Sequence, residues 1–434
     1  MKSEVSIVKG KDVEKMVAEA LELIGGIESV VKKGDKVLIK PNVHGPHPLE
    51  DHITTDPRLV VAVANQCHKA GAKEVLVGEA PSLTGAGATI HAYEISGMKE
   101  AIEKSGAATL VDLETDEYVD VKVPGGFILK NMPRPKSLIS ADVVISTPVM
   151  KTHHGARVTG SLKNMMGTLN REGKSFIHEV GLHESIADIN KARKIDLVVA
   201  DMITCMEGLG PIAGRTVNVQ PDGSHYVSEI VGGVLVPMDV IVASKDPVAC
   251  DATCCRIMKI DPTTVNYIPL AYKHGLGNMR LNEIQVKGLQ IKDVARAFAQ
   301  CPTDLDEFAD YIIPHTEGAC FGCLAYEYFA LENMRARGLL DRAKGLHVVM
   351  GPKEEIPDEW KSGGDLLLLG NCLTKFSHMG MFGAGCPPSG RPFMVGTLMR
   401  SLSPEAHANA AEVRKQHPTP LEIEENKKLN QNKK

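Results

Sequence analysis

Four cysteines near the C-terminus stand at spacings that suit an iron–sulfur cluster. Cys320 and Cys323 form a C-x-x-C pair, Cys372 follows Gly370–Asn371, and Cys386 stands before two prolines. A [4Fe–4S] cube takes one thiolate at each of four iron corners, so its ligands can come from separate loops. A structural zinc site with four cysteines is usually built from two close pairs, and the second pair is missing here. The spacing therefore predicts a [4Fe–4S] cluster on these four cysteines, with zinc or four ordinary thiols as alternatives.

The order C-x-x-C, Gly-x-Cys, Gly-Cys-Pro-Pro in this segment resembles that of the nickel–iron hydrogenase small subunit and of the related quinone-reductase subunit. In the hydrogenase, the corresponding segment holds the cluster nearest the active site. The resemblance implies a cluster held in an α/β module. No nickel-binding motif of the large subunit accompanies it, so hydrogenase activity is not implied.

Polar side chains also follow several short apolar runs in the first 300 residues. Lys40 and Asn42 follow one run, Glu79 the next, and Lys151 with His153 a third. An ammonium and an amide suit carboxylates and phosphates, and a histidine or a carboxylate can transfer protons. We assign catalysis to Lys151, His153 and Glu79. We assign substrate binding to Lys40, Asn42, Lys163, Asn164, Asp201 and Glu207.

The elements that position these residues alternate between short apolar runs and amphipathic segments. This alternation predicts an α/β fold, a mostly parallel sheet with helices on both faces. The expected strands are Val5–Val8, Lys36–Lys40, Glu74–Val77, Asp142–Thr147 and Ile195–Asp201. The expected helices are Asp12–Leu23 and Pro57–Ala70. Because the carboxyl ends of parallel strands meet at one edge, where ligands bind, we expect the polar side chains to converge on one crevice.

Several motifs, in the order found here, resemble the family catalogued as domain of unknown function 362 over most of residues 1–300. The motifs are Lys40–Asn42, Ser146–His153, Ser161–Gly167, Asp201–Pro211 and Ala243–Asp251. The resemblance implies the fold and the crevice and supplies no reaction. Members are often fused to or associated with ferredoxin-like segments, whereas this chain carries the dispersed four-cysteine set instead of a C-x2-C-x2-C-x3-C-P run.

A divalent metal bound by histidines is an alternative use of the crevice. His153, His154, His178 and His183 fall close together in sequence, and Asp188 and Asp201 follow. Adjacent side chains on an extended segment point to opposite faces, so His153 and His154 can share an ion only if the chain turns. A proton-transfer role for His153 is an equal alternative, because an unperturbed imidazole titrates near neutrality.

Cysteines outside the four-cysteine set are expected to be core thiols. Cys250, Cys254 and Cys255 lie in the apolar segment Pro247–Met258, where small buried cysteines are common. Cys250 and Cys254 share one helical face, so metal binding by this pair is an alternative.

Composition excludes several classes of protein. Hydrophobic residues make up 43% of the chain, the net charge is −5 and aromatic residues make up 4%, with no basic stripe that would indicate a nucleic-acid surface. No apolar run reaches the roughly 20 residues that span a bilayer. The first residues carry no secretory signal pattern. We therefore expect a cytoplasmic protein that binds neither membrane nor nucleic acid.

The length of 434 residues exceeds one ordinary core and predicts several units. We expect an α/β domain with the crevice over residues 1–305 and an iron–sulfur module over 306–403. A polar, flexible tail is expected over 404–434. In the module, Leu324–Arg337 is predicted to be a helix, and Leu346–Met350 and Asp365–Leu369 are predicted to be strands.

These features together indicate an iron–sulfur oxidoreductase. It would pass single electrons between its cluster and a small anionic substrate, or the cofactor of a redox partner protein. One alternative is a non-redox, metal-dependent lyase or isomerase with a structural cluster. Another is a cluster carrier or maturation protein without turnover. The sequence indicates neither the direction of electron flow nor the oligomeric state.

Overall fold

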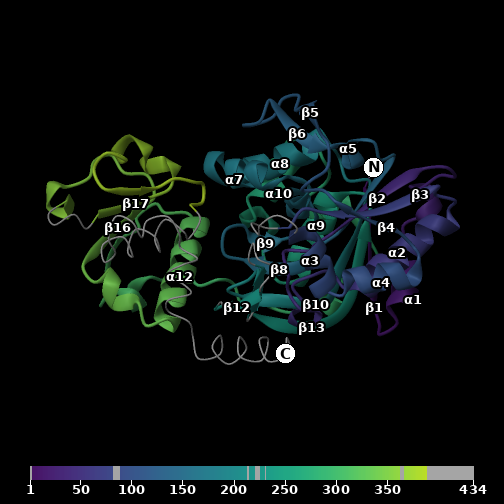
Figure 1. Cartoon of the computed structure of the whole chain (residues 1–434), viewed down its shortest axis with the longest axis horizontal. Helices are drawn as coiled ribbons and strands as arrows, with labels where there is room; N and C mark the ends of the chain where they lie inside the picture. The colour runs from purple at the N-terminus through teal and green to yellow at the C-terminus, as the bar shows by residue number, and fades with distance from the viewer. Residues whose placement is uncertain are drawn as a thin grey trace.

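A computed structural model describes residues 2–81, 88–212, 215–219, 225–229, 231–361 and 366–388. A ten-stranded sheet with its helices and a separate four-stranded sheet form the two lobes visible in Figure 1. The predicted polar tail, residues 404–434, lies outside the described residues.

The large sheet has the strand order β14-β1-β13-β10-β7-β2-β3-β4. These strands are β1 (Ser3–Lys9), β2 (Lys36–Pro41), β3 (Glu74–Glu79), β4 (Thr109–Asp112), β7 (Val143–Thr147), β10 (Leu197–Gly208), β13 (Gly233–Ser244) and β14 (Ile284–Gly288). The five predicted strands are confirmed as β1, β2, β3, β7 and β10. Their central residues are apolar and buried because helices cover both faces of the sheet.

The sheet is mostly parallel, as predicted, with an antiparallel exception. Strands β10, β7, β2, β3 and β4 run side by side in one direction. Strand β13 runs antiparallel to both of its neighbours, β1 and β10. The carboxyl ends of β2, β3, β7 and β10 therefore do meet at one edge.

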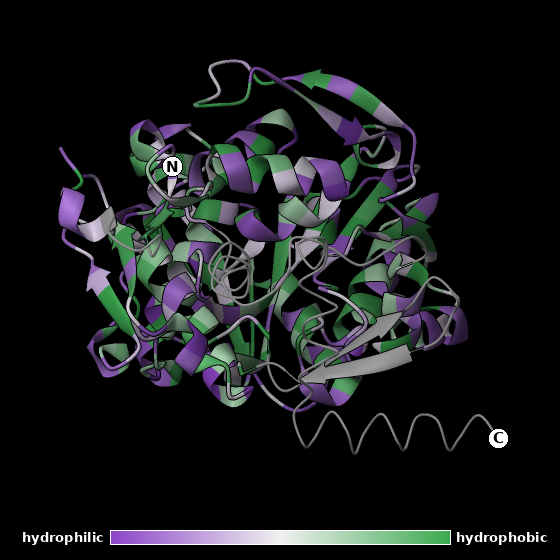
Figure 2. Ribbon diagram, turned by 60° about the vertical axis from the view of Figure 1, so that its left-hand side comes forward, coloured by the Kyte–Doolittle hydropathy of each residue, from purple (hydrophilic) through white to green (hydrophobic). Residues whose placement is uncertain are grey.

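Helices pack on both faces of the large sheet. One face carries α1 (Val13–Glu22), α2 (Pro57–Lys69), α3 (Ala88–Ile95) and α4 (Met98–Ser105). The other carries α6 (Ser161–Asn164), α8 (Leu182–Ala192), α9 (Pro247–Ile257), α10 (Tyr267–Lys273) and α11 (Ile291–Val294). Figure 2 shows hydrophobic residues along the strands and mixed colours on the surrounding helices. Of the helices described, none combines the length and the apolar character that a membrane span requires.

Capping explains where the predicted helices begin. The Asp12 carboxylate accepts a hydrogen bond from the Lys15 backbone N–H at 3.2 Å, and Asp56 accepts one from Arg58 N–H at 2.9 Å. Each aspartate satisfies a donor that the first helical turn leaves unpaired. Pro57 then occupies the first helical position, where a missing N–H costs nothing.

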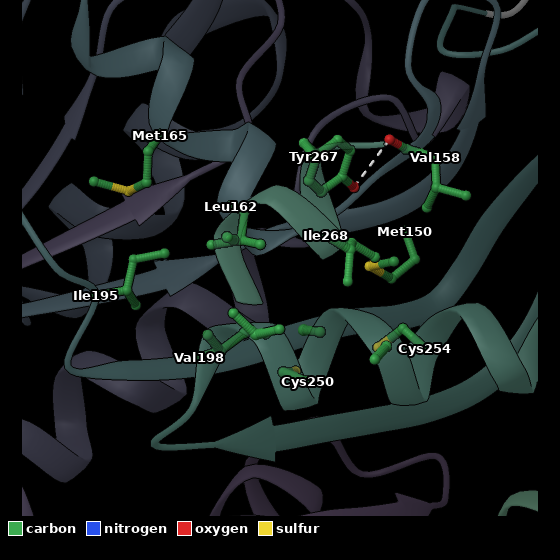
Figure 3. Packing of buried hydrophobic residues seen from close by; sticks show 14 of the residues in the cluster. Met150, Val158, Leu162, Met165, Ile195, Val198, Cys250, Cys254, Tyr267 and Ile268 are labelled. Carbon is green, nitrogen blue, oxygen red and sulfur yellow. Dashed lines mark hydrogen bonds between the residues drawn. The ribbon is translucent and has the colours of Figure 1, made fainter. Parts of the chain in front are cut away.

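The cysteines of α9 lie in the core, as predicted. Figure 3 shows Cys250 and Cys254 among apolar side chains that include Leu162, Val198 and Ile268. Both thiols are fully buried, and the hydrogen bond with Cys254, followed by burial, raises the pKa of Cys250 well above its usual value.

The segment that carries Lys151 differs from the prediction. We expected a loop, but Val149–His153 forms strand β8, which pairs with β10 and with β9 (Arg157–Thr159). Strand β10 continues past Asp201, so this part of β10 has an edge that β7 does not cover. Strand β8, which Pro148 separates from β7, pairs with that edge. Lys151 is therefore held on a paired strand.

The smaller sheet is wholly parallel, in the order β15-β16-β17-β18. Its strands are β15 (Ile312–His315), β16 (Leu346–Met350), β17 (Leu366–Leu369) and β18 (Met381–Gly383), and its long helix is α12 (Phe321–Ala336). The predicted strand Leu346–Met350 is confirmed. The predicted helix begins three residues early, because Cys320 rather than a later residue is its N-cap.

Two hairpins and two helices complete the described elements. They are β5 (Tyr118–Lys122) with β6 (Asn131–Pro135), β11 (Arg215–Val219) with β12 (His225–Glu229), α5 (Lys136–Ile139) and α7 (Arg171–Val180). Helix α7 leads directly into α8 and brings residues 178–183 to the smaller sheet.

Candidate active site

The four predicted ligands gather at the carboxyl edge of the smaller sheet. Cys320 and Cys323 follow β15, Cys372 follows β17, and Cys386 follows β18. These strands are parallel, so the segments that follow them lie at the same edge. The hydrogen bond with Cys320 raises the pKa of Cys323, and burial, followed by the Cys320 charge, raises the pKa of Cys372 and Cys386.

Gly370 lies beside two of these sulfurs. A side-chain Cβ at this position would lie 3.5 Å from Cys372 Sγ and 3.6 Å from Cys323 Sγ. Its φ of +104° also lies where residues other than glycine are strained. The two distances are ordinary contact distances, so the positive φ rather than a lack of space favours glycine here.

One pair of these thiols is close enough to bind a single ion. Cys320 Sγ and Cys323 Sγ are 3.7 Å apart, close to the separation of about 3.8 Å that tetrahedral Zn–S bonds of about 2.3 Å would give. No three or more His, Cys, Asp or Glu side chains in the described ranges are arranged to hold one metal ion.

The cysteine edge packs directly against the large domain. Cys386 N–H donates to the His178 carbonyl at 3.2 Å, and Leu182 N–H donates to the Cys386 carbonyl at 2.9 Å. The Asn371 side-chain amide donates to the Glu179 carbonyl at 2.6 Å. The loop between α7 and α8 thus holds the last cysteine by its backbone.

A second contact joins α12 to the turn after β8. The ring of His154 stacks on Phe329 with centroids 4.3 Å apart, and it meets the edge of Tyr326 at 4.4 Å. A Cβ on Gly155 would overlap the Tyr326 ring, so only glycine admits this close approach. The Arg157 guanidinium lies 3.8 Å from the centroid of Phe321. The two lobes therefore meet at the residues that follow Lys151.

Lys40, Glu79 and Asn164 satisfy one another at the edge of the large sheet. Lys40 Nζ lies 2.8 Å from Glu79 Oε2 and 3.3 Å from Asn164 Oδ1, and all three side chains are buried. Asn164 Nδ2 donates to the Lys40 carbonyl at 2.8 Å. Burial raises the pKa of Glu79, and the Lys40 charge opposes that rise. This network links β2 and β3 to α6.

Lys163 belongs to a group of buried side chains that also includes Lys151 and several histidines. Burial lowers the pKa of Lys151 and of five histidines, and the Lys163 charge lowers each further: His44, His153, His154, His178 and His183. Removal of water lowers the pKa of Lys163 itself to about 8. Burial, followed by the Lys163 charge, lowers that of Lys151 to about 7. Among the described residues, neither lysine forms an ion pair with a carboxylate within 4.0 Å.

Hydrogen bonds fix the protons of two histidines. His153 Nδ1 accepts from the backbone N–H groups of Gly155 at 2.9 Å and Ala156 at 3.1 Å. The neutral ring therefore carries its proton on Nε2. His154 Nδ1 lies 2.8 Å from the Gly210 carbonyl and must donate, which leaves its Nε2 as an acceptor. The turn after β8 brings the two rings to 4.8 Å, so neighbouring positions in sequence do converge.

The remaining predicted residues have different surroundings. Asp201 accepts from Asp56 N–H at 2.8 Å and from Ile203 N–H at 2.9 Å, and burial raises its pKa to about 7. Glu207 binds Arg296 at 3.0 Å and the backbone of Ala299 at 3.1 Å, so it anchors the segment that leads to the smaller sheet.

Asn42 keeps a buried side-chain oxygen without a hydrogen-bond partner. Buried polar atoms are normally paired, so this oxygen is available to a bound molecule. Nδ1 of both His178 and His183 is likewise buried and without a partner, and burial lowers the pKa of each histidine to about 4.

Several site residues were not singled out from the sequence. His44 Nδ1 lies 3.1 Å from His47 Nε2 in the loop that follows β2. Their position just after Lys40–Asn42 was a signal that could have identified them. Tyr326 and Phe329 had no comparable signal, because only the packing of α12 brings them to the crevice.

A family model described as Domain of unknown function (DUF362) matches residues 37–256, just over half of the chain. A thylakoid-associated protein of Synechocystis sp. is 27% identical over 263 residues, which cover 59% of this chain and 73% of that protein.

Two solved structures have a distant likeness to this chain. The lactate racemase apoprotein of Thermoanaerobacterium thermosaccharolyticum has a TM-score of 0.34 and 12% identity, over 80% of this chain and 69% of that one. A Thermotoga maritima protein has a TM-score of 0.30 and 11% identity, over 83% and 97% of the two chains. These scores support no conclusion about a reaction.

Proposed function

This chain belongs to the family described as Domain of unknown function (DUF362), and we propose that it is an iron–sulfur redox enzyme. In this proposal Cys320, Cys323, Cys372 and Cys386 bind a [4Fe–4S] cluster. The bound cluster supplies electrons one at a time. The other reactant is a small anion held in the crevice beside Lys163.

The observation that carries the proposal is the contact between the fourth cysteine and the crevice. Cys386 exchanges backbone hydrogen bonds with the end of α7, which carries His178, and the start of α8, which carries His183. A cluster with only a structural role has no need of this position. Cys320 and Cys372 are exposed, whereas Cys323 is buried, so a cluster on these cysteines would lie between solvent and the crevice. Such a position suits electron transfer.

The charge of the crevice favours an anion. Lys151 and Lys163 lie near neutral histidines, and no carboxylate of the described residues neutralises either lysine directly. A buried cation without a counter-charge is costly, and a bound anion would offset that cost. Lys163, which is partly exposed, is placed to bind the charged group, and the Nε2–H of His153 can donate a hydrogen bond to it.

Electron balance requires a second redox partner. The reduced cluster would give one electron to the bound molecule, or the oxidised cluster would take one. A one-electron carrier protein would then restore the cluster, and it would dock where Cys320 and Cys372 are exposed.

The test is analysis of protein that is purified without oxygen. We expect about four irons and four sulfides per chain, and an EPR signal that appears on reduction with dithionite. Stoichiometric zinc without sulfide would contradict the cluster. A full cluster that dithionite cannot reduce would favour the lyase or isomerase alternative, and a cluster released readily to an apoprotein would favour the carrier alternative.

A further inference from the structure

Lys151 has the surroundings of an amine that attacks a carbonyl carbon. Its backbone is fixed because β8 pairs with β9 on one side and β10 on the other, with Thr159 and Met206 opposite Lys151. Its Nζ donates one hydrogen bond, to the Ile53 carbonyl at 2.7 Å. A neutral amine can make this bond as well as an ammonium can, and its lone pair then remains free.

Two neighbours of Lys151 supply the other groups that such a reaction needs. His153 lies two residues further along the same strand, so the two side chains leave the same face of β8. Its Nδ1 accepts two backbone hydrogen bonds, which leaves Nε2–H as a donor. Lys163 is close enough for its charge to act on both residues, and it can bind a carboxylate.

We propose that Lys151 forms an imine with the carbonyl carbon of a small oxo acid, whose carboxylate pairs with Lys163. This inference rests on the proposed function, because it names the class of anion that the crevice holds. The substrate class is an anion with an aldehyde or ketone carbon near its carboxylate, as in pyruvate or 2-oxoglutarate.

The chemistry needs no oxidant or reductant. The Nζ lone pair forms a C–N bond while the C=O π electrons move to oxygen, which the His153 Nε2–H can stabilise by a hydrogen bond. A proton moves from nitrogen to that oxygen and gives a carbinolamine. The C–O bond then breaks, and the second hydrogen of the amine leaves with the oxygen as water. One amine and one carbonyl thus give one imine and one water.

The protonation state of Lys151 supports this role. Burial, followed by the Lys163 charge, lowers the pKa of Lys151 to about 7, whereas an ordinary lysine titrates near 10.5. At about pH 8 the neutral fraction of Lys151 would exceed that of an ordinary lysine by roughly 300-fold. Only the neutral amine is nucleophilic.

Lys174 is a matched control. It is also buried, and burial lowers its pKa to about 8. Its Nζ is occupied by the Ala80 carbonyl at 2.7 Å and the Pro81 carbonyl at 3.0 Å, and Glu114 lies 3.6 Å away. Lys174 therefore has the reactivity of a buried lysine whose Nζ is held by two carbonyl groups and a nearby carboxylate.

The experiment traps the imine in the full-length protein purified without oxygen. Pyruvate or 2-oxoglutarate is added at about pH 7.5, between the pKa values of Lys151 and Lys163, and cyanoborohydride reduces any imine to a stable amine. Peptide mass spectrometry then locates the adduct. We expect the Lys151 peptide to gain the mass of the oxo acid less one oxygen atom, because water is lost when the imine forms and two hydrogens are added when it is reduced. We expect at least a tenfold smaller yield on the Lys174 peptide.

Two further experiments test the roles of the Lys151 amine and of the Lys163 carboxylate site separately. With Lys163→Met, labelling by pyruvate should need roughly tenfold more pyruvate, because the charge that binds the carboxylate is gone. Labelling by the neutral carbonyl compound propanal should fall less than labelling by pyruvate, because it loses no carboxylate contact and is reduced only by the higher pKa of Lys151 without the Lys163 charge. With pyruvate, the yield should rise through about pH 7 as Lys151 loses its proton and fall above about pH 8 as Lys163 does.

The absence of a Lys151 adduct with either oxo acid would overturn the inference, as would equal labelling of Lys151 and Lys174. Iron, sulfide and EPR measured on the same samples keep the two proposals apart. A reducible cluster without an adduct contradicts the imine alone. An adduct on protein that binds no cluster contradicts the redox proposal alone.

Discussion

The backbone N–H of Cys386 donates a hydrogen bond to the carbonyl of His178 at 3.2 Å, so a proposed cluster ligand and a crevice histidine share one loop contact. Leu182 N–H completes the arrangement by donating to the Cys386 carbonyl at 2.9 Å. A change of charge at the cysteines should therefore affect the crevice, and a change of charge in the crevice should affect the cysteines. Only a short stretch of protein separates the two, and electrostatic interactions in buried protein are stronger than in water.

Replacement of cysteines should separate proposed ligands from core thiols. Cys372→Ser should abolish the cluster, since a cube needs its fourth thiolate, and Gly370 places this sulfur beside the set. Cys254→Ala should retain the cluster and lower the free energy of unfolding by about 1 kcal/mol, the cost of a small cavity in the core. Iron content and urea denaturation measure the two effects. Loss of iron in the Cys254 variant would show that the ligand set is wrongly assigned.

Removal of the Lys163 charge should weaken anion binding without unfolding the protein. Lys163→Met keeps the aliphatic stem and loses a contact worth about 1.5–3 kcal/mol, which corresponds to roughly tenfold to hundredfold weaker affinity for sulfate or oxalate. Lys136→Met is the control, because Lys136 is exposed and pairs with Glu117 away from the crevice. Calorimetric titration of both variants makes the comparison. Equal affinity in the wild type and Lys163→Met would place the anion elsewhere.

The Lys40–Glu79 pair should contribute to stability, because breaking it strands a buried charge. Lys40→Met should lower the free energy of unfolding by about 3–5 kcal/mol. The double variant Lys40→Met/Glu79→Gln should recover part of that loss, since no charge is then left unpaired. Denaturant unfolding of the single and double variants tests this coupling. A single variant as stable as the wild type would mean that the pair is not buried in solution.

Anion affinity should fall as pH rises through about 7 to 8. The protonated lysines bind the anion, and the pKa of Lys151 is lowered to about 7 and that of Lys163 to about 8. Raising the pH through these values removes both positive charges, so affinity is highest below them. Sulfate is the suitable probe, because its charge is constant in this range. Affinity that is constant or rises with pH would contradict a lysine site.

The mostly parallel sheet, and the meeting of polar side chains at its edge, could be predicted from the sequence because apolar runs and polar strand ends repeat in a regular order. The same reasoning placed Lys40, Glu79 and Asn164 at one edge, where they do meet. Strand β8 could not be predicted, because Lys151 and His153 gave that segment a polar appearance, and only pairing with β10 makes it a strand. Local pattern carries no information about such tertiary pairing.

The junction of the two lobes could not be predicted either. Residues 178–182 meet Cys386 across roughly 200 positions of sequence. His154 meets Phe329 in the same region, and the only trace in sequence is Gly155, whose lack of a side chain admits Tyr326. Such contacts depend on how the folded helices and strands pack against one another, so residue spacing along the chain does not predict them.

The most direct test of the central claim is the midpoint potential of the cluster with and without an anion in the crevice. A bound negative charge about 10 Å from the cluster, at an effective dielectric constant of about 20, would make reduction harder by roughly 1–2 kcal/mol. An EPR-monitored redox titration of the anaerobic protein should therefore show a potential lower by several tens of millivolts in saturating oxalate, and a much smaller shift in Lys163→Met. A potential that saturating oxalate leaves unchanged in the wild type would contradict the claim that the cluster and the crevice form one redox site.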